Sequence, residues 1–321
     1  MRKLLLLSFL LCLPYFADAQ YKPGKRRKNS NSFTNKRNKP RKEFILGIGA
    51  SNFLGELGGA NQIGTNFIKD LEFSATRTSF AFGMRYKFKK RFAVSGGFHY
   101  LMLSGSDKLT KEPFRSNRNL SFRAPIFEAS IQAEFFFTKE QQGHLYKIKN
   151  AKGMKNYDFQ GYLFVGFGGF YFNPKAQYKG NWVALQPLGT EGQGLPGNKK
   201  KYSRVSICIP YGIGAKYAIN KDWAVGLEIG IRKTFTDYID DVSTVYYDNS
   251  ELYQERGIEA ATLADPSLAN YPESLGGDAT GYNQTAAGQQ RGDSRDKDSY
   301  AFLNVTISYK MPYKRRTRSK F

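Results

Sequence analysis

Cysteine is nearly absent from this sequence of 321 residues, which contains only two. Cys12 lies in an apolar run near the start of the chain and lacks the Leu-x-small-Cys pattern of a lipoprotein signal. Once that run is removed on export, Cys208 is the only thiol, so no disulfide can form within the chain. Cys208 falls at an inward position of a predicted strand and is best explained as a small packing residue rather than a redox or metal centre.

Histidine is as rare as cysteine, which limits the possible active sites. The two histidines, His99 and His144, fall in separate predicted segments and cannot share one site. His99 with Ser95 or Ser104 is the only combination that resembles the Ser and His pair of outer-membrane lipid hydrolases and acyltransferases. A lone inward histidine is more often a packing residue. The sequence therefore predicts no enzyme, no catalytic residue, no cofactor and no metal site.

Long apolar runs are also missing after residue 19, where no stretch reaches 18 residues and a membrane-spanning helix is excluded. Residues 1–19 have the pattern of a signal peptide. Arg2 and Lys3 precede an apolar run over 4–16, and residues 17–19 form a small-x-small cleavage site. We therefore expect the chain from residue 20 onward to be exported.

Strict alternation of apolar and polar residues is the strongest pattern that is present. Over 223–232 the odd positions are Trp, Val, Leu, Ile and Ile, whereas the even positions are Ala, Gly, Glu, Gly and Arg. A period of two predicts a β-strand with two unlike faces. Such stretches cover residues 44–52, 73–88, 91–103, 121–137, 157–172, 202–218, 223–235 and 299–311.

The composition of the polar face predicts which side of these strands is inside. It consists mostly of Gly, Ala and Ser with an occasional charge, which suits a crowded lumen better than the surface of a water-soluble barrel. The apolar face then meets lipid. We therefore predict an all-β fold, an eight-stranded antiparallel up-and-down transmembrane β-barrel over residues 44–311.

The connections between the predicted strands alternate between short and long. Residues 89–90 and 219–222 form tight hairpins, whereas 54–72, 104–120, 173–201 and 236–298 form long loops at the other end. Residues 138–156 depart from this pattern and are expected to form a short helix. In outer-membrane barrels the long loops are extracellular, so we expect an integral outer-membrane protein with periplasmic termini.

An aromatic girdle is expected at the end with the short turns, where such residues mark the membrane–water interface. Its predicted members are Phe44, Tyr86, Phe88, Phe92, Phe135, Phe137, Tyr157, Tyr217, Trp223 and Tyr309.

The predicted inner face carries charges of both signs. An eight-stranded barrel is barely wide enough for its own side chains, so opposite charges there should pair and fill the lumen. A wide channel is not expected. The predicted lumen plug consists of Arg77, Arg85, His99, Glu128, Glu134, Arg204, Glu228 and Arg232.

The formal charge of +22 is concentrated at the predicted periplasmic end. Residues 20–43 form a basic, disordered arm with ten Lys and Arg against one Glu, and the tail 312–321 adds five cations. The loop 236–298 instead has thirteen acids against four bases, a net of 4 − 13 = −9. Export makes a nucleic-acid partner improbable. The predicted partner-binding residues are Lys25, Arg26, Arg27, Lys28, Arg315 and Arg316.

Three interpretations of the basic arm and tail stay open on sequence alone. They bind an acidic periplasmic partner, they lie on the anionic inner leaflet of the outer membrane, or they are merely solvated ends.

Several loop motifs go beyond the pattern of a generic barrel. They are FYFNPKA at 170–176, Trp182, LQPLGTEGQG at 185–194 and RKTFTDYIDDVSTVYY at 232–247. With these motifs the chain resembles, over about residues 44–311, the PorG-like family of Bacteroidetes outer-membrane barrels. The long basic arm and the Gly- and Asp-rich part of the last loop, 248–298, depart from that family's pattern.

The resemblance implies a role in type IX protein secretion and gliding. In that family the barrel is a scaffold associated with a periplasmic ring, built from a PorK-like lipoprotein and a PorN-like protein, and it supplies no catalytic residues. Lipid of the outer membrane is the other expected partner. The alternatives are a small outer-membrane pore or ligand-binding barrel and, less favoured, a lipid-modifying enzyme.

The same motifs predict polar contacts at the outer rim. Three acids follow Arg232 and Lys233, so salt bridges are expected to hold the loop stem over the barrel. Pro187 and the nearby glycines predict a tight loop in which Trp182 and Leu185 cap the lumen. The predicted rim residues are Trp182, Gln186, Glu191, Asp237, Asp240 and Asp241.

Overall fold

The structure is a computed structural model that describes residues 41–57, 75–110, 113–138, 159–220, 222–267 and 285–311. The predicted signal peptide, nearly all of the basic arm, the basic tail and most of the connection 138–156 lie outside the described residues.

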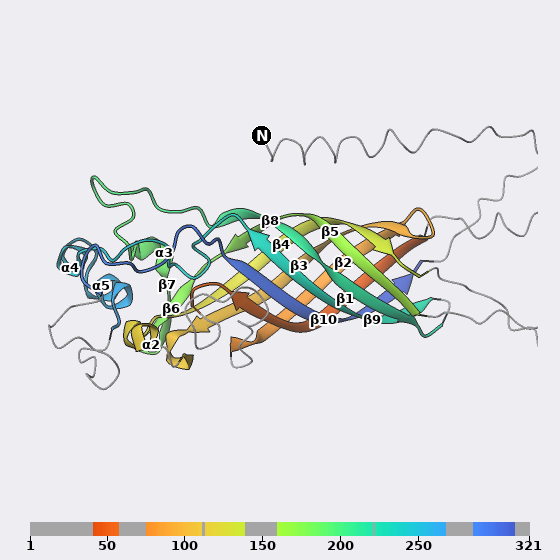
Figure 1. Cartoon of the computed structure of the whole chain (residues 1–321), viewed down its shortest axis with the longest axis horizontal. Coiled ribbons are helices and arrows are strands. Elements are labelled where there is room, and N and C mark those ends of the chain that lie inside the picture. Colours follow the sequence, from red (N-terminus) through yellow and green to blue (C-terminus); the bar gives the residue numbers. More distant parts are fainter. Residues whose placement is uncertain are drawn as a thin grey trace, which may run out of the picture. The chain divides into compact units, whose positions relative to one another are not determined.

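Eight strands of the described chain close into one antiparallel barrel (Figure 1). Each strand pairs with its two sequence neighbours in the barrel, and the pairing of the last strand with the first closes the ring. The predicted all-β barrel is thereby confirmed. The barrel strands are β1 (Arg41–Leu54), β2 (Arg77–Lys87), β3 (Phe92–Ser106), β4 (Ser121–Phe136), β5 (Phe159–Phe172), β8 (Val205–Ala218), β9 (Trp223–Thr234) and β10 (Ser299–Lys310).

All eight predicted strands are present, and only their ends differ. The largest difference is at the start of β2, which was predicted at residue 73 and begins at Arg77. The strand β1 begins at Arg41, so the last residues assigned to the basic arm belong to the barrel. The short turns are also where they were predicted, with Lys89 N–H bonded to Phe92 O (3.2 Å) and Ile219 N–H to Trp223 O (3.0 Å).

The barrel has apolar side chains outside and polar ones inside. Phe98 and Ile131 are each 67% exposed on the outer face, whereas Arg85, Glu128 and Arg232 are buried in the lumen. Water would penalise such an apolar outer surface, and a hydrocarbon solvent favours it. The wall is therefore that of a barrel that spans a lipid bilayer.

Aromatic residues form an outward-facing row at each end of this wall. At the short-turn end, the ring centroids of Phe92 and Phe135 lie 5.3 Å apart. The second row, which was not predicted, begins with Phe80 and Tyr100 (6.3 Å) and continues to Phe127, which lies 5.1 Å from Tyr100. Phe127 and Phe135 are both on β4, roughly 26 Å apart along the strand at about 3.3 Å per residue. With the strand tilt, this spacing suits the apolar band of a membrane barrel.

The long loops carry short elements that the sequence did not predict. They lie beyond one end of the barrel, which we call the long-loop end (Figure 1). No helix in the described part of the chain is long and apolar enough to cross a membrane. The elements are η5 (Asp107–Leu109), α2 (Pro113–Arg118), the hairpin of β6 (Lys175–Tyr178) and β7 (Asn181–Ala184), α3 (Leu185–Leu188), α4 (Asn249–Arg256) and α5 (Ile258–Ala264).

Local signals and contacts between loops together explain why α4 and α5 form. The carboxylate of Asp248 caps α4 by accepting hydrogen bonds from Ser250 N–H and Glu251 N–H. Gly257, at φ 84°, separates the two helices in a conformation that favours glycine. Leu252 of α4 is buried with Leu195 of a different loop. The long-loop end thus has small apolar cores of its own instead of being only a solvated loop.

Candidate functional site: the lumen plug and the mouth network

The lumen near the short-turn end is filled by a chain of ion pairs. Glu43 of β1 accepts hydrogen bonds from the Lys216 ammonium of β8 at 2.7 and 2.9 Å. Arg85 of β2 bridges Glu43 (3.4 Å) and Glu134 of β4. Its guanidinium also lies over the ring of Tyr162, 4.7 Å from the centroid. These side chains are buried, so their charges are compensated by one another rather than by water.

A second ion pair crosses the lumen nearer the long-loop end. Arg232 of β9 binds Glu128 of β4 through two donors, with Nε 3.0 Å from Oε2 and Nη2 3.1 Å from Oε1. The Tyr300 hydroxyl donates to the same carboxylate at 3.0 Å. Phe302 packs against both the Arg232 guanidinium (4.3 Å) and the His99 ring (5.6 Å). The strands β4 and β9 are not neighbours in the sheet, so this pair joins opposite walls.

Little free volume is left inside the barrel. Glu228 is held by the Tyr162 hydroxyl at 2.8 Å. A small cavity beside it, lined by Gln132, Ser95 and Asn304 among others, has a volume of about 40 Å³. Such a volume holds a few water molecules at most, since one needs roughly 10–15 Å³ by the same measure. The lumen is therefore blocked over the height of both ion-pair layers.

Two residues predicted for the lumen lie elsewhere. Arg77, the first residue of β2, is exposed and donates to Thr76 O at 2.8 Å. Arg204 precedes β8, and its guanidinium lies 5.6 Å from the centroid of the Tyr171 ring on the outer face. The apolar and polar alternation in the sequence extends past the ends of the strands, where the barrel no longer encloses a lumen. A position there that the alternation assigns to the inside lies at the rim instead. The lumen prediction is wrong for Arg77 and Arg204.

The structure places the other six predicted plug residues in the lumen, and it adds Glu43, which the sequence interpretation assigned to the basic arm. The signal for Glu43 was the alternation itself. Phe44, Leu46 and Ile48 face outward, which puts position 43 inside.

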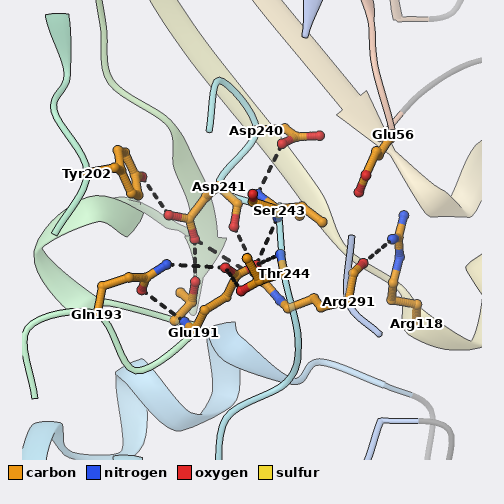
Figure 2. Close-up of polar contacts among 12 residues, drawn as sticks. Glu56, Arg118, Glu191, Gln193, Tyr202, Asp240, Asp241, Ser243, Thr244 and Arg291 are labelled. Carbon is orange, nitrogen blue, oxygen red and sulfur yellow. Dashed lines mark hydrogen bonds and ion pairs between the residues drawn. The ribbon is translucent and has the colours of Figure 1, made fainter. Parts of the chain in front are cut away.

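Above the plug, Glu191 joins two long loops (Figure 2). Its carboxylate accepts hydrogen bonds from Ser243 N–H (2.9 Å), Thr244 N–H (3.1 Å) and the Thr244 hydroxyl (2.7 Å). It also forms a buried ion pair with Arg291, with Nη1 3.1 Å from Oε1. One carboxylate thus fixes the loop between β7 and β8 to two separate parts of the loop between β9 and β10.

Asp241 provides a second connection between these loops. We call the contacts of Glu191, Asp241 and Arg291 the mouth network. Its carboxylate accepts hydrogen bonds from the Thr190 and Tyr202 hydroxyls, both at 2.5 Å. Its carbonyl oxygen accepts one from Arg291 at 2.5 Å. The Tyr202 ring is stacked on Tyr238, with centroids 4.4 Å apart. Burial raises the pKa of Asp241 to about 6, and Arg291 opposes that rise.

The partners of the rim acids differ from those predicted. Arg232 binds Glu128 inside the barrel, and the Lys233 ammonium donates to Lys297 O at 2.7 Å. The predicted salt bridges to Arg232 and Lys233 are therefore not formed. Of the three aspartates, Asp241 instead has Arg291 as its cation, with Nη2 4.0 Å from Oδ2, fifty residues further along the chain.

The predicted cap over the lumen is wrong as well. Trp182 is 47% exposed, and the Arg123 guanidinium lies over its ring, 5.6 Å from the centroid. Leu185 is buried, but it packs with Ala176 and Leu263 in a core between loops. Gln186 donates to Tyr202 O at 3.0 Å and so does contribute to the mouth.

Beside the mouth network lies a cluster of carboxylates from three segments, formed by the half-buried Glu56 and the buried Asp237, Asp240 and Asp298. Asp240 accepts hydrogen bonds from Leu57 N–H (3.3 Å) and Val242 N–H (3.0 Å). Asp298 accepts one from Ile239 N–H at 2.9 Å. Among the described residues, no group of His, Cys, Asp or Glu side chains is arranged to hold a metal ion.

Burial and mutual repulsion perturb these carboxyl groups. Burial raises the pKa of Glu56 to about 7, and Asp237 adds to the rise. Burial likewise raises the pKa of Asp237 to about 7. Burial and the neighbouring acids raise the pKa values of Asp240 and Asp298 well above the usual range. The cluster is therefore partly protonated at neutral pH.

Comparison with known proteins identifies structures of similar fold. No family model and no curated protein matches the chain. The Yersinia pestis attachment invasion locus protein Ail is 8% identical, with a TM-score of 0.36, and the match covers 85% of this chain and 99% of Ail. Neisserial surface protein A is also 8% identical, with a TM-score of 0.38 and coverages of 84% and 97%. Escherichia coli outer membrane protein W is 12% identical, with a TM-score of 0.36 and the same coverages.

The class of this protein follows from the features of the barrel itself. At these identities and TM-scores the comparisons give no information about function. The closed ring of eight antiparallel strands, the apolar outer wall and the charged lumen define a transmembrane β-barrel of the outer-membrane type.

The cross-lumen pair predicts a large loss of stability when one partner is removed. Glu128→Ala leaves Arg232 buried without a counter-ion, and we expect the free energy of unfolding to fall by about 3–5 kcal/mol. The double variant Glu128→Leu, Arg232→Met should recover most of it. Urea unfolding in micelles, followed by heat-modifiable gel migration, measures both, with Glu255→Ala, at an exposed position of α4, as the control. Equal losses in the single and double variants would contradict the ion-pair account.

The carboxylate cluster predicts a pH dependence of the long-loop end. Because the folded-state pKa of Asp237 lies above its ordinary value of 3.8, the unfolded chain releases its proton first as the pH rises. The group therefore stabilises the folded loop most below about pH 4, and this contribution is lost as the pH passes through about 7. Asp237→Asn removes that dependence. We expect the variant to resist proteolysis of residues 236–298 better than the wild type at pH 8, and by a smaller margin at pH 5.

The control for this comparison is Glu255→Gln, which changes an exposed carboxylate on α4. Cleavage is followed by mass spectrometry with a protease active at both pH values. If Asp237→Asn is cut as fast as the wild type at pH 8, the titration of Asp237 does not govern the loop.

Proposed function

We propose that this barrel is a scaffold that anchors a periplasmic ring of the type IX secretion machinery to the outer membrane. The observation that carries the proposal is the filled lumen. Charged pairs cross it at two heights, which suits a membrane anchor and does not suit a conduit. The resemblance of the loop motifs to PorG-like barrels supplies the secretion system, and the expected ring partners are a PorK-like lipoprotein and a PorN-like protein.

The connectivity of the chain supports a basic contact surface at one end. Glu43 is paired with Lys310, and Met311 N–H donates to Lys42 O at 2.9 Å, so the first and last described residues lie on adjacent strands. Both basic segments, 20–40 and 312–321, are thus joined to the short-turn end. The strands β4 and β5, which the basic segment 138–156 joins in the sequence, also meet at this end, where the Thr138 hydroxyl donates to Phe159 O at 3.1 Å. We place this end in the periplasm, where the ring would bind.

A small pore or ligand-binding barrel is the second candidate, and a lipid-modifying enzyme the third. The enzyme would need His99 to act with Ser95 or Ser104. The Ser104 hydroxyl instead donates to Ala75 O at 3.1 Å, and the His99 ring packs on Phe302. The described residues therefore offer no assembled Ser and His pair.

Planar-bilayer recordings separate the scaffold from the pore. Because two layers of ion pairs cross the lumen, we expect the purified protein to give no stable large currents, in bilayers where a porin control conducts. Stable large currents from the wild type would favour the pore.

Affinity purification from mildly solubilised membranes tests the ring contact. Replacing Lys25, Arg26, Arg27, Lys28, Arg315 and Arg316 by Gln should weaken recovery of the ring proteins, and high salt should weaken it in the wild type, because contacts between exposed charges are screened. The matched control replaces six cations of the long-loop end, namely Lys108, Lys179, Lys199, Lys200, Arg295 and Lys297. Equal recovery from both variants would refute the basic contact surface.

A further inference from the structure

An apolar groove runs across the outer wall at the second aromatic row, near the long-loop end. It has a volume of about 630 Å³, within the range of roughly 300–1,000 Å³ that is typical of ligand sites. Ala129 and Gly169 face outward with little or no side chain and form a hollow between larger neighbours. The walls of the groove are Phe80, Phe82, Phe98, Tyr100, Phe127 and Tyr171.

Cationic side chains border this groove on the side toward the long loops. Val205 lines the groove, and the preceding Arg204 lies over Tyr171 at 5.6 Å, which places its guanidinium beside the opening. Arg123 is outward-facing on β4, the strand that supplies Phe127, and pairs in register with Lys175 of β6.

These cations have no acidic partner among the described residues. Within the described part of the chain, neither Arg204, Arg123 nor Lys175 forms an ion pair. Arg204 reaches only the amide oxygen of Asn173, at 3.5 Å, apart from its ring contact. Arg123 contacts the Trp182 ring at 5.6 Å. A cation held on an aromatic ring keeps its hydrogen-bond donors available for an anion.

We infer that this groove and its cationic edge bind one membrane lipid with an anionic phosphate headgroup. One acyl chain lies over Ala129 and Gly169 between the aromatic walls, and the phosphate contacts Arg204, with Arg123 and Lys175 next to it. The inference rests on the barrel spanning a bilayer and does not depend on a role in secretion.

The position of the site favours a lipid over a protein or a soluble anion. The groove opens on the lipid-facing wall, where acyl chains are the surrounding solvent. Arg204 lies over Tyr171 beside the second aromatic row, and Arg123 is four residues beyond Phe127 on β4 toward the long loops. Aromatic rows mark the depth at which headgroups begin. Basic pockets at this depth bind anionic lipid headgroups. A soluble anion would use the cations but leave the apolar groove unoccupied.

Native mass spectrometry with two lipids of identical acyl chains tests the site. Phosphatidylglycerol has a net negative charge and phosphatidylcholine has none, so mixing them equally in micelles isolates the headgroup. We expect one phosphatidylglycerol molecule to be retained in preference to phosphatidylcholine. Loss of a charge-assisted hydrogen bond in Arg204→Gln should reduce that preference by about tenfold. Ala129→Trp, which fills the groove, should abolish retention of both lipids.

Two matched variants control for charge and for the added ring. Arg295→Gln removes an exposed cation of the long-loop end away from the groove. Ala133→Trp adds the same ring on the same outward face of β4, outside the groove. Both should retain lipid as the wild type does, and heat-modifiable migration confirms that each variant is folded. Absence of a retained lipid, equal losses in Arg204→Gln and Arg295→Gln, or an unaffected Ala129→Trp would each overturn the inference.

Discussion

The pairing of Arg232 with Glu128 across the lumen expresses the constraint on which the rest of this structure depends. The outer wall is apolar because it meets hydrocarbon, so the charges of the strands must point into a barrel too narrow to hydrate them. Those charges are tolerable because they pair with opposite charges inside the lumen. Near the short-turn end, Glu43 compensates the buried charges of Arg85 and Lys216 in the same way. Ion pairs of this kind contribute little on a water-exposed surface, but inside this lumen they are needed to compensate buried charges.

Above the barrel a different principle holds the chain together. The loops have no continuous sheet to join, and they rely on carboxylates that gather several donors each. Glu191 binds two backbone amides, a hydroxyl and a guanidinium, all from the loop between β9 and β10. Small apolar clusters such as that of Leu195 and Leu252 add to this. The barrel is thus held together mainly by backbone hydrogen bonds between strands, whereas the long-loop end is held together mainly by side-chain carboxylates and small apolar clusters.

The features that could be predicted from the sequence are those set by local properties of the chain, such as the alternation of side chains along a strand. The period of two over β9 follows from the geometry of an extended chain, so the eight strands and their inward faces were predictable. The errors at Arg77 and Arg204 arise because the height of the rim depends on neighbouring strands. Glu191 finds Ser243 and Arg291 at 52 and 100 residues' distance, and no local pattern reports such a contact. The short helix α4 buries only Leu252, so its sequence has little of the apolar periodicity that predicts a helix.

The seam between β1 and β10 has a consequence for biogenesis. These strands pair residue by residue from Glu43 with Lys310 to Leu54 with Ser299, so the ring is completed by contacts between the two extremes of the described chain. Until β10 has been made and inserted, two sheet edges with unpaired backbone groups stay open. Non-local pairing of this kind is slow to form. The nascent protein must therefore be kept from pairing with other chains until its last strand arrives.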